Sequence, residues 1–148
     1  MSRLASLEAL YEATRRIGLR GNLEELVAEV LERARELVRF EHCALMLVDP
    51  DTGRLEVKRV IGYGERRPHV LGLTLEPGQG LSGWAAAHRR AVRVGDVRRD
   101  DRYLEGLAEA RSNLAVPLMV GNEGAGVLNA ESERTDAFTE EHEKLLTV

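Results

Sequence analysis

The residues whose types and spacing could bind a ligand lie around a glycine-rich stretch near the middle of the sequence. Gly78, Gly80 and Gly83 satisfy the pattern Gly-x-Gly-x-x-Gly, in which a loop and the first turn of a helix hold the pyrophosphate of a dinucleotide. Asp96 and Asp100 follow at about the offset of the carboxylate that binds the ribose of such a ligand. A nucleotide-binding loop is therefore one interpretation of this stretch.

The sequence on either side of the glycines favours a different interpretation. Pro77 separates the first glycine from the strand expected at Val70 to Leu75, and proline cannot donate a hydrogen bond within a central strand. Further on, the turn at residues 121–124 predicts an antiparallel hairpin where a dinucleotide fold needs crossover helices. We interpret the three glycines as the hinge of a lid. The first two would permit positive φ, and the third would let the following helix approach the sheet closely.

No set of catalytic side chains is recognisable. The sequence has no serine or cysteine beside an evident base, no HExxH, no P-loop lysine and no pair of carboxylates in an apolar setting. None of the four histidines has a partner at metal-ligand spacing, although a haem ligand from the helix that carries His88 remains an alternative. Cys43 is the only cysteine, and its apolar neighbours predict a buried small hydrophobe. We therefore expect neither turnover nor a metal site.

The composition narrows the class of protein further. The 148 residues suit one domain with a single core, and the net charge of -4 gives no field that would attract nucleic acid. No apolar run is long enough to span a bilayer and no secretory signal is present, so we expect a cytoplasmic protein without membrane contact. The arginines between residues 89 and 102 alternate with aspartates, which predicts a paired, solvated surface.

These residues must be positioned by helices at the start of the chain and by strands after them. A first helix is expected within residues 1–20, because apolar residues recur there at steps of three and four. Leu4, Leu7 and Tyr11 also fit the seam of a short coiled coil, so this helix could join two subunits. A second helix is expected over residues 22–39, capped by the asparagine at its start.

Strands and short helices are expected over the rest of the chain. Apolar runs separated by turn residues predict one hairpin over residues 43–63 and another over residues 113–132. Because hairpins pair antiparallel, the predicted fold class is α+β, with helices packed on a central sheet. The segments expected between the hairpins are a strand at residues 70–75, a helix at 81–90, a strand at 91–97 and a short helix at 101–110.

The last helix is expected from about residue 140, capped by Thr139 with Glu140 and Glu141 in its first turn. It reaches Val148 after about two turns without a stop signal. We therefore expect the native chain to continue into an output domain.

In this order and spacing, the segments resemble a GAF domain. The resemblance covers nearly the whole chain, so residues 1–148 are expected to form a single domain. No one motif is specific, but their succession is. The matching residues are the glycine loop, Asp96-Val97, Asp101-Arg102-Tyr103, Ser112 to Leu118, Gly126-Val127-Leu128 and Phe138.

The resemblance implies a profilin-like fold, with a central antiparallel sheet, helices packed on one face and short helices covering a small-molecule pocket on the other. It implies a regulatory sensor, often dimeric, that precedes a histidine kinase or a transcription activator. The first helices are also similar to the sensory domains of bacterial enhancer-dependent activators. The candidate pocket residues are Trp84, Asp96, Arg102, Tyr103, Arg111 and Ser112.

Each candidate also has a structural interpretation. Trp84 could stack on a planar ligand or pack in the lid. Asp96 and Ser112 could cap turns, and Arg111 could pair with a nearby glutamate.

The resemblance does not select a ligand. Ala130 and His142 stand where cyclic-nucleotide-binding members carry Lys and Asp, and members that reduce free methionine sulfoxide or bind bilins need cysteines that Cys43 alone cannot supply. Two functions stay open. One is a sensor whose small-molecule effector reorients the C-terminal helix, and the other is a structural dimerisation module without a ligand.

Overall fold

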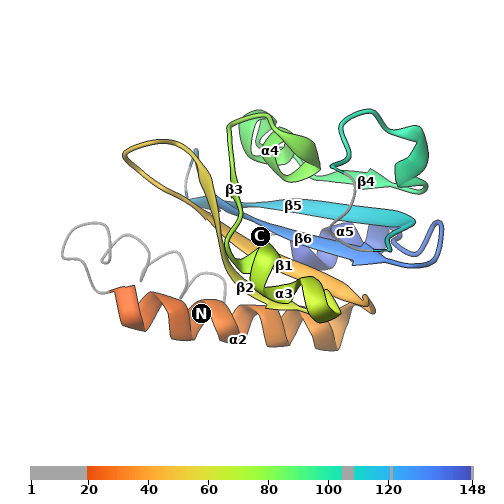
Figure 1. The fold of residues 1–148 in the computed structure, drawn as a ribbon, viewed down its shortest axis with the longest axis horizontal. Coiled ribbons are helices and arrows are strands. Elements are labelled where there is room, and N and C mark those ends of the chain that lie inside the picture. Colours follow the sequence, from red (N-terminus) through yellow and green to blue (C-terminus); the bar gives the residue numbers. More distant parts are fainter. Residues whose placement is uncertain (1–19, 105–108, 121, 148) are drawn as a thin grey trace.

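The computed structural model describes residues 20–104, 109–120 and 122–147, which form one six-stranded sheet with helices on both faces (Figure 1). The first expected helix, and with it the seam of Leu4, Leu7 and Tyr11, lies outside the described residues. No described helix has the length and apolar character needed to cross a membrane. In chain order the elements are α2 (Arg20–Leu37), β1 (His42–Val48), β2 (Leu55–Ile61), η1 (Gly64–Arg66), α3 (Arg67–Leu71), β3 (Thr74–Leu75), α4 (Gly80–His88), β4 (Val92–Val94), η2 (Val97–Arg99), β5 (Ser112–Val120), β6 (Glu123–Ser132) and α5 (Glu140–Leu146).

The sheet has the spatial order β3-β2-β1-β6-β5-β4, and every described pairing is antiparallel. β1 and β6 form its centre, and β3, which leads to the glycine loop, is a two-residue strand at one edge. A dinucleotide fold needs a buried parallel strand at that point, so the sheet excludes this interpretation. The predicted α+β class is confirmed.

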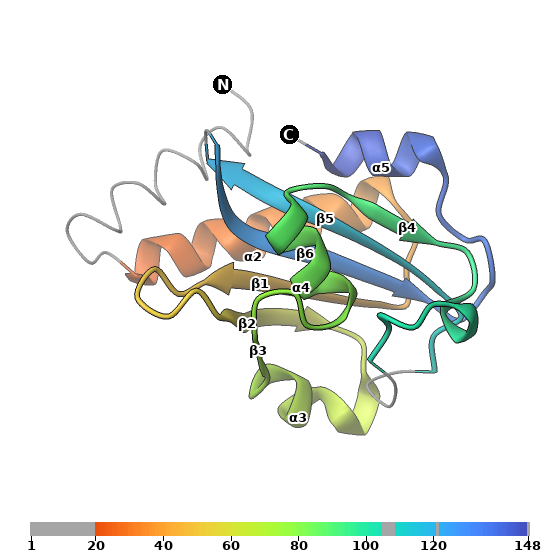
Figure 2. The ribbon, with the colours of Figure 1, turned by 90° about the horizontal axis from the view of Figure 1, so that it is seen from above.

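Alternation along the strands gives the sheet two different faces. Leu45 and Leu128 belong to the core beneath α2 and α5, whereas Ala44 and Val127 belong to the core beneath α3 and α4. Figure 2 shows α4 crossing in front of the sheet and α2 running behind it. The predicted division into a helix-packed face and a face covered by short helices is therefore confirmed.

Helix α2 packs on the sheet through Leu31 and Ala34, and Val38, directly after the helix, is buried in the same core. The helix already includes Arg20, so the expected cap at Asn22 is wrong. A side-chain cap requires a residue that is outside the helical conformation, and Asn22 lies within the helix.

The strand expected at residues 70–75 is also wrong over most of its length. Residues 67–71 form α3 instead, because the fixed φ of Pro68 suits the first turn of a helix. The Gly72 N–H then bonds back to the carbonyls of Pro68 and His69, at 3.2 and 3.1 Å. Only Thr74 and Leu75 remain extended, as β3.

The helix expected at residues 101–110 is absent from its described part, residues 101–104 and 109–110. The Asp100 carboxylate accepts a hydrogen bond from the backbone N–H of Arg102 at 2.9 Å, so a turn forms where a helix would begin. The last helix forms as expected, with Thr139 as its cap. Thr139 Oγ1 accepts from the His142 N–H at 3.2 Å, and His142 Nδ1 accepts from the Thr139 N–H at 3.2 Å.

Candidate functional site

Five polar side chains lie on the sheet face that α4 covers, and we call them the polar floor: His42, Tyr63, Asn113, Asn129 and Glu131. Glu131 on β6 is the register partner of His42 on β1 and of Asn113 on β5. Register partners point to the same face of a sheet, so these three side chains form one row across its middle. Asn129 lies two residues earlier on β6 and therefore shares this face.

Glu131 is the central charged group of the polar floor, with only 2 % of its surface exposed. Burial raises its pKa, and hydrogen bonds from Tyr63 and Tyr103 partly oppose that rise. Its Oε2 atom is buried and has no hydrogen-bond partner among the described residues. No ion pair between Glu131 and an arginine or lysine is present in the described part of the chain. A buried carboxylate without a counter-charge is costly, so its environment is unusual for a protein core.

The two asparagines provide amide groups beside this carboxylate. Asn113 Nδ2 donates to Asn129 Oδ1 at 2.9 Å, and Asn113 is 1 % exposed. With its amide turned over, the Asn113 nitrogen would instead lie 3.3 Å from Glu131 Oε1. The amide can therefore serve either neighbour.

His42 presents a hydrogen-bond donor next to the carboxylate. Its Nδ1 accepts from the backbone N–H of Tyr63 at 2.9 Å, so in the neutral ring the proton is on Nε2. Nε2 is buried and without a partner among the described residues. Within the described part of the chain, the polar floor thus contains an unsatisfied acceptor on Glu131 and an unsatisfied donor on His42.

Tyr63 reaches the polar floor through a strained turn. Its φ is 67°, in the left-handed region that non-glycine residues seldom adopt, and the preceding Gly62 has φ 83°. A Cβ on Gly62 would collide with the Glu41 carbonyl, so this turn requires glycine. The strain directs the Tyr63 N–H to His42, and the two rings lie 5.1 Å apart. Strain of this kind is typical of functional sites.

The cover over this face consists of α4 and residues 97–104. The two parts meet where Gly80 approaches the side chain of Leu104, and again where the Arg102 guanidinium lies 4.8 Å from the centre of the Trp84 ring. Arg102 is held by two hydrogen bonds to the Asp100 carboxylate, at 2.6 and 2.9 Å. Trp84 also stacks on His88, with 4.2 Å between ring centres. His88 is thus engaged at the outside of the cover, away from the polar floor.

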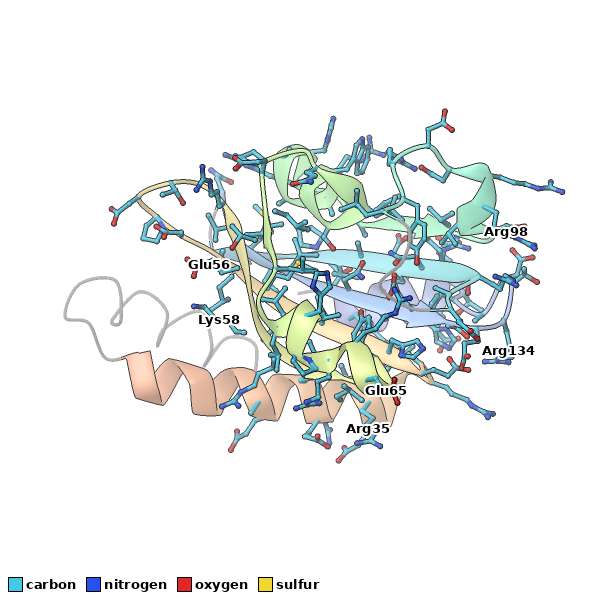
Figure 3. All side chains as sticks on the ribbon, viewed as in Figure 1. Arg35, Glu56, Lys58, Glu65, Arg98 and Arg134 are labelled. Carbon is cyan, nitrogen blue, oxygen red and sulfur yellow. The ribbon has the colours of Figure 1, made fainter. Side chains whose placement is uncertain are left out.

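Three of the sequence-predicted pocket residues, Trp84, Arg102 and Tyr103, come together in this cover, and Tyr103 reaches Glu131. Asp96 instead caps η2, where its side chain accepts from the Arg98 N–H. The hydrogen bond from the Arg98 side chain lowers the pKa of Asp96 to about 2. Figure 3 shows Arg98 at the periphery, among the outward-pointing charged side chains.

The other two predicted pocket residues lie elsewhere. The Arg111 side chain is exposed. The Ser112 hydroxyl donates to the Arg134 carbonyl at 2.5 Å and accepts from the Ala137 N–H at 3.3 Å. Ser112 therefore ties β5 to the segment that leads into α5, and its structural interpretation is the one that the geometry supports.

The glycine loop has part of the expected geometry. Gly78 and Gly80 have positive φ, 81° and 68°, as predicted. Gly83 does not serve contact with the sheet: a Cβ there would lie 2.9 Å from the Gly78 carbonyl carbon and 3.1 Å from the Glu76 oxygen. It lets α4 pack on its own loop, where the Gly78 N–H donates to the Gly83 carbonyl at 3.1 Å. Hinge motion of this loop stays a prediction.

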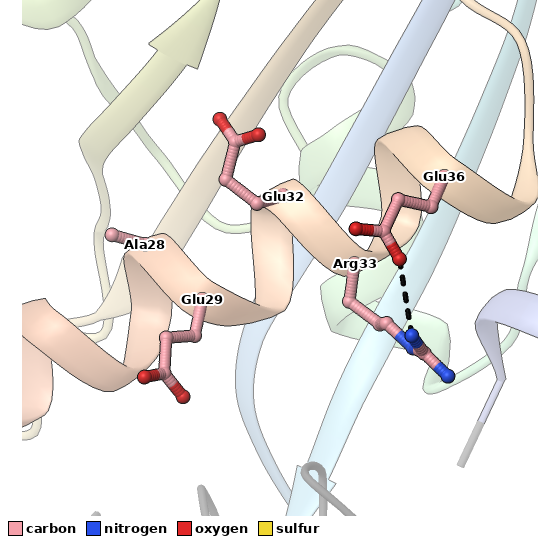
Figure 4. Close-up of a pocket in the computed structure, with 5 residues that line it drawn as sticks. All are labelled: Ala28, Glu29, Glu32, Arg33 and Glu36. Atoms are coloured by element: carbon pink, nitrogen blue, oxygen red, sulfur yellow. Dashed lines mark hydrogen bonds and ion pairs between the residues drawn. The ribbon is translucent and has the colours of Figure 1, made fainter.

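An open hollow lies apart from the polar floor, on the side of α2 that faces away from the sheet (Figure 4). It is lined by Ala28, Glu29, Glu32, Arg33 and Glu36, and Arg33 pairs with Glu36 at 3.0 Å. Its charged side chains are exposed, which is typical of a solvated helix face. Across the described residues, no group of three or more His, Cys, Asp or Glu side chains could hold a metal ion.

Comparison with known proteins fits this architecture. The GAF domain model matches residues 21–148. The chain belongs to the GAF domain family. GAF domains are commonly regulatory sensor modules, and in this one the polar floor lies on the sheet face opposite α2 and α5. No curated protein gives a significant match to the sequence.

Solved structures share the GAF fold at low sequence identity. The GAF domain of a phosphoenolpyruvate-protein phosphotransferase from Coxiella burnetii has a TM-score of 0.73 and 20% identity, over 96% of this chain and 84% of that one. Two free methionine-R-sulfoxide reductases are also similar. The Thermoplasma acidophilum enzyme has a TM-score of 0.68 and 21% identity, over 95% and 86% of the two chains. The Neisseria meningitidis enzyme, solved with its substrate, has a TM-score of 0.69 and 23% identity, over 97% of this chain and 78% of that one. The fold therefore occurs in both regulatory domains and enzymes.

Sequence reasoning did not predict the polar floor. A signal existed in the second hairpin, where Asn113, Asn129 and Glu131 are polar residues within otherwise apolar strands. Their shared face follows only from the register of β5 and β6. His42 and Tyr63 gave no signal, since one stands at the start of a strand and the other in a turn.

Proposed function

We propose that this GAF domain is a non-catalytic sensor that binds a small molecule on the polar floor, beneath the cover formed by α4 and residues 97–104. The observation that carries the proposal is Glu131, a buried carboxylate in a row of polar side chains, one of whose oxygens has no partner among the described residues. Apolar residues of similar size would make this core more stable. Buried polar groups without hydrogen-bond partners occur mainly at functional sites. A ligand on the polar floor would supply the partners that the described residues do not.

Binding without turnover is supported by the position of the only thiol. Cys43 is fully buried in the core that faces α2, on the opposite side of the sheet from Glu131. Burial raises its pKa, so the thiolate that redox chemistry needs is strongly disfavoured. A ligand on the polar floor would therefore meet no reactive sulfur.

The same strands offer a route from the ligand to the end of the domain. Asn113 belongs to the polar floor, and its neighbour Ser112 holds the backbone at Arg134 and Ala137, just before α5. A ligand that shifts the start of β5 would thus move the residues that position α5. We propose that this movement is passed to an output domain, in a homodimer.

The proposal is tested by thermal unfolding in the presence of a metabolite collection. A ligand at 100 times its Kd should stabilise the folded state by about 2.7 kcal/mol. The stabilisation should disappear in Glu131→Gln and persist in Glu133→Gln, which removes an exposed carboxylate directly after β6. If Glu131→Gln retains the full shift, the polar floor is not the site. If no metabolite stabilises the protein, the structural dimerisation module is favoured.

A further inference from the structure

We propose that the ligand of the polar floor is a small organic cation, a protonated amine or an amidine, whose N–H groups bind the unpaired oxygen of Glu131. This inference rests on the proposed function, because it names the class of ligand for the same site. The fold alone does not determine this class of ligand.

The first argument is the balance of charge. Glu131 is almost completely buried, and the described groups that face it are the neutral side chains of Tyr63, Tyr103 and Asn113, together with the imidazole of His42. A buried carboxylate normally has an arginine or lysine as its partner. That partner is absent from the described residues, so the position opposite Oε2 is complementary to a cation that this part of the chain does not supply.

Two arginines of the cover, Arg98 and Arg102, are already engaged elsewhere. Arg102 lies in the cover, but its guanidinium is bound by Asp100 and stands against Trp84. Arg98 pairs with Asp96 and points outward from η2. Neither supplies the missing charge, and neither turns the polar floor into a site for an anion. A ligand carboxylate or phosphate would instead face the like charge of Glu131.

The second argument is the arrangement of acceptors and rings. Besides the Glu131 oxygen, the hydroxyls of Tyr63 and Tyr103 can accept hydrogen bonds, and so can the amide oxygens of Asn113 and Asn129. Aromatic rings and an apolar cover beside a carboxylate favour an organic cation over a hydrated inorganic one. The His42 Nε2–H adds one donor, which suits a ligand that carries an acceptor oxygen next to its amino group.

The test uses three probes of nearly the same shape and different charge: benzamidine, benzamide and benzoate. Binding is followed by NMR of ¹⁵N-labelled protein, in which the side-chain amide signals of Asn113 and Asn129 report directly from the polar floor. We expect benzamidine to shift these signals and benzoate to leave them unchanged. In Glu131→Gln, benzamidine should bind about tenfold or more weakly, whereas Glu133→Gln should bind it as the unaltered protein does.

Three results would overturn the inference. If benzamide or benzoate shifts the asparagine signals as strongly as benzamidine, a ligand binds the floor but the cation is wrong, and the proposed function survives. If benzamidine binds Glu131→Gln unchanged, the cation does not contact the carboxylate. If none of the three probes shifts the asparagine signals at millimolar concentration, the floor is not a cation site. The metabolite screen then decides separately whether the floor binds anything.

Discussion

Glu131 should make the ligand-free domain less stable than it could be, and this is the sharpest prediction of the structure. Replacing it by glutamine keeps the shape and the acceptor for Tyr63 and Tyr103, while it removes the buried charge. Glutamine still leaves one polar atom of its amide without a partner, but it carries no charge that must be desolvated. We therefore expect Glu131→Gln to raise the free energy of unfolding by about 1–3 kcal/mol. At about 3 °C per kcal/mol for a domain of this size, Tm should rise by roughly 3–9 °C.

The pH dependence of stability provides an independent test of whether the buried charge of Glu131 destabilises the folded state. Because burial raises the pKa of Glu131 in the folded state, the folded protein binds this proton more tightly than the unfolded chain. The stability that protonated Glu131 provides is fully present below the unfolded pKa, about 4.3, and is lost as pH rises through the folded pKa. The increase in the free energy of unfolding caused by Glu131→Gln should therefore be small at pH 4 and largest at high pH.

Other titrations are separable from this one. The pKa of Tyr63 is raised by burial, so Tyr63 stays neutral across this range. The depressed pKa of Asp96, about 2, causes a loss of stability only as pH falls below the unfolded value near 4. The pH range in which Asp96 changes stability is therefore below the range in which Glu131 does.

The assay is urea unfolding between pH 4 and 8, followed by circular dichroism, on the unaltered protein, Glu131→Gln and Glu133→Gln. The exposed control should change stability by less than about 0.5 kcal/mol at every pH. A loss of stability in Glu131→Gln at pH 8 would refute the reasoning. It would show that Glu131 stabilises the ligand-free domain through its hydrogen bonds. Its buried charge would then not be a source of instability that a ligand could remove.

Three further predictions concern the cover, the route to α5 and the glycine loop. Asp100→Asn should release the Arg102 guanidinium that lies against Trp84. Acrylamide should then quench the fluorescence of this sole tryptophan more strongly. The control Asp101→Asn, at an exposed position, should leave quenching unchanged. Ser112→Ala should cost about 1–3 kcal/mol in urea unfolding, because it removes two part-buried hydrogen bonds, to the Arg134 carbonyl and from the Ala137 N–H, each of which contributes about 0.5–1.5 kcal/mol. Ligand affinity should stay within about twofold. Gly83→Ala should cost about 1–3 kcal/mol in the same assay, because its Cβ would press on the loop backbone; an unchanged midpoint would show that this contact is easily relaxed.

Features that depend on local chemistry could be predicted from the order of residues alone. Hairpin signals gave the antiparallel α+β sheet, the glycines gave positive φ at Gly78 and Gly80, and Thr139 marked the start of α5. The apolar run around Cys43 likewise predicted a buried thiol. Each of these follows from backbone sterics, capping or burial within a few residues, so no knowledge of distant contacts was needed.

The place of the candidate site depends on contacts between distant parts of the chain. His42, Asn113 and Glu131 come from three strands that are far apart in the sequence, and one row of strand register brings them together. A shift by one residue in any of these strands would turn its side chain to the opposite face, and local patterns do not specify register at that level. For the same reason, the sequence predicted pocket residues such as Trp84 and Arg102, which lie in the cover, and did not predict Glu131 on the sheet beneath it.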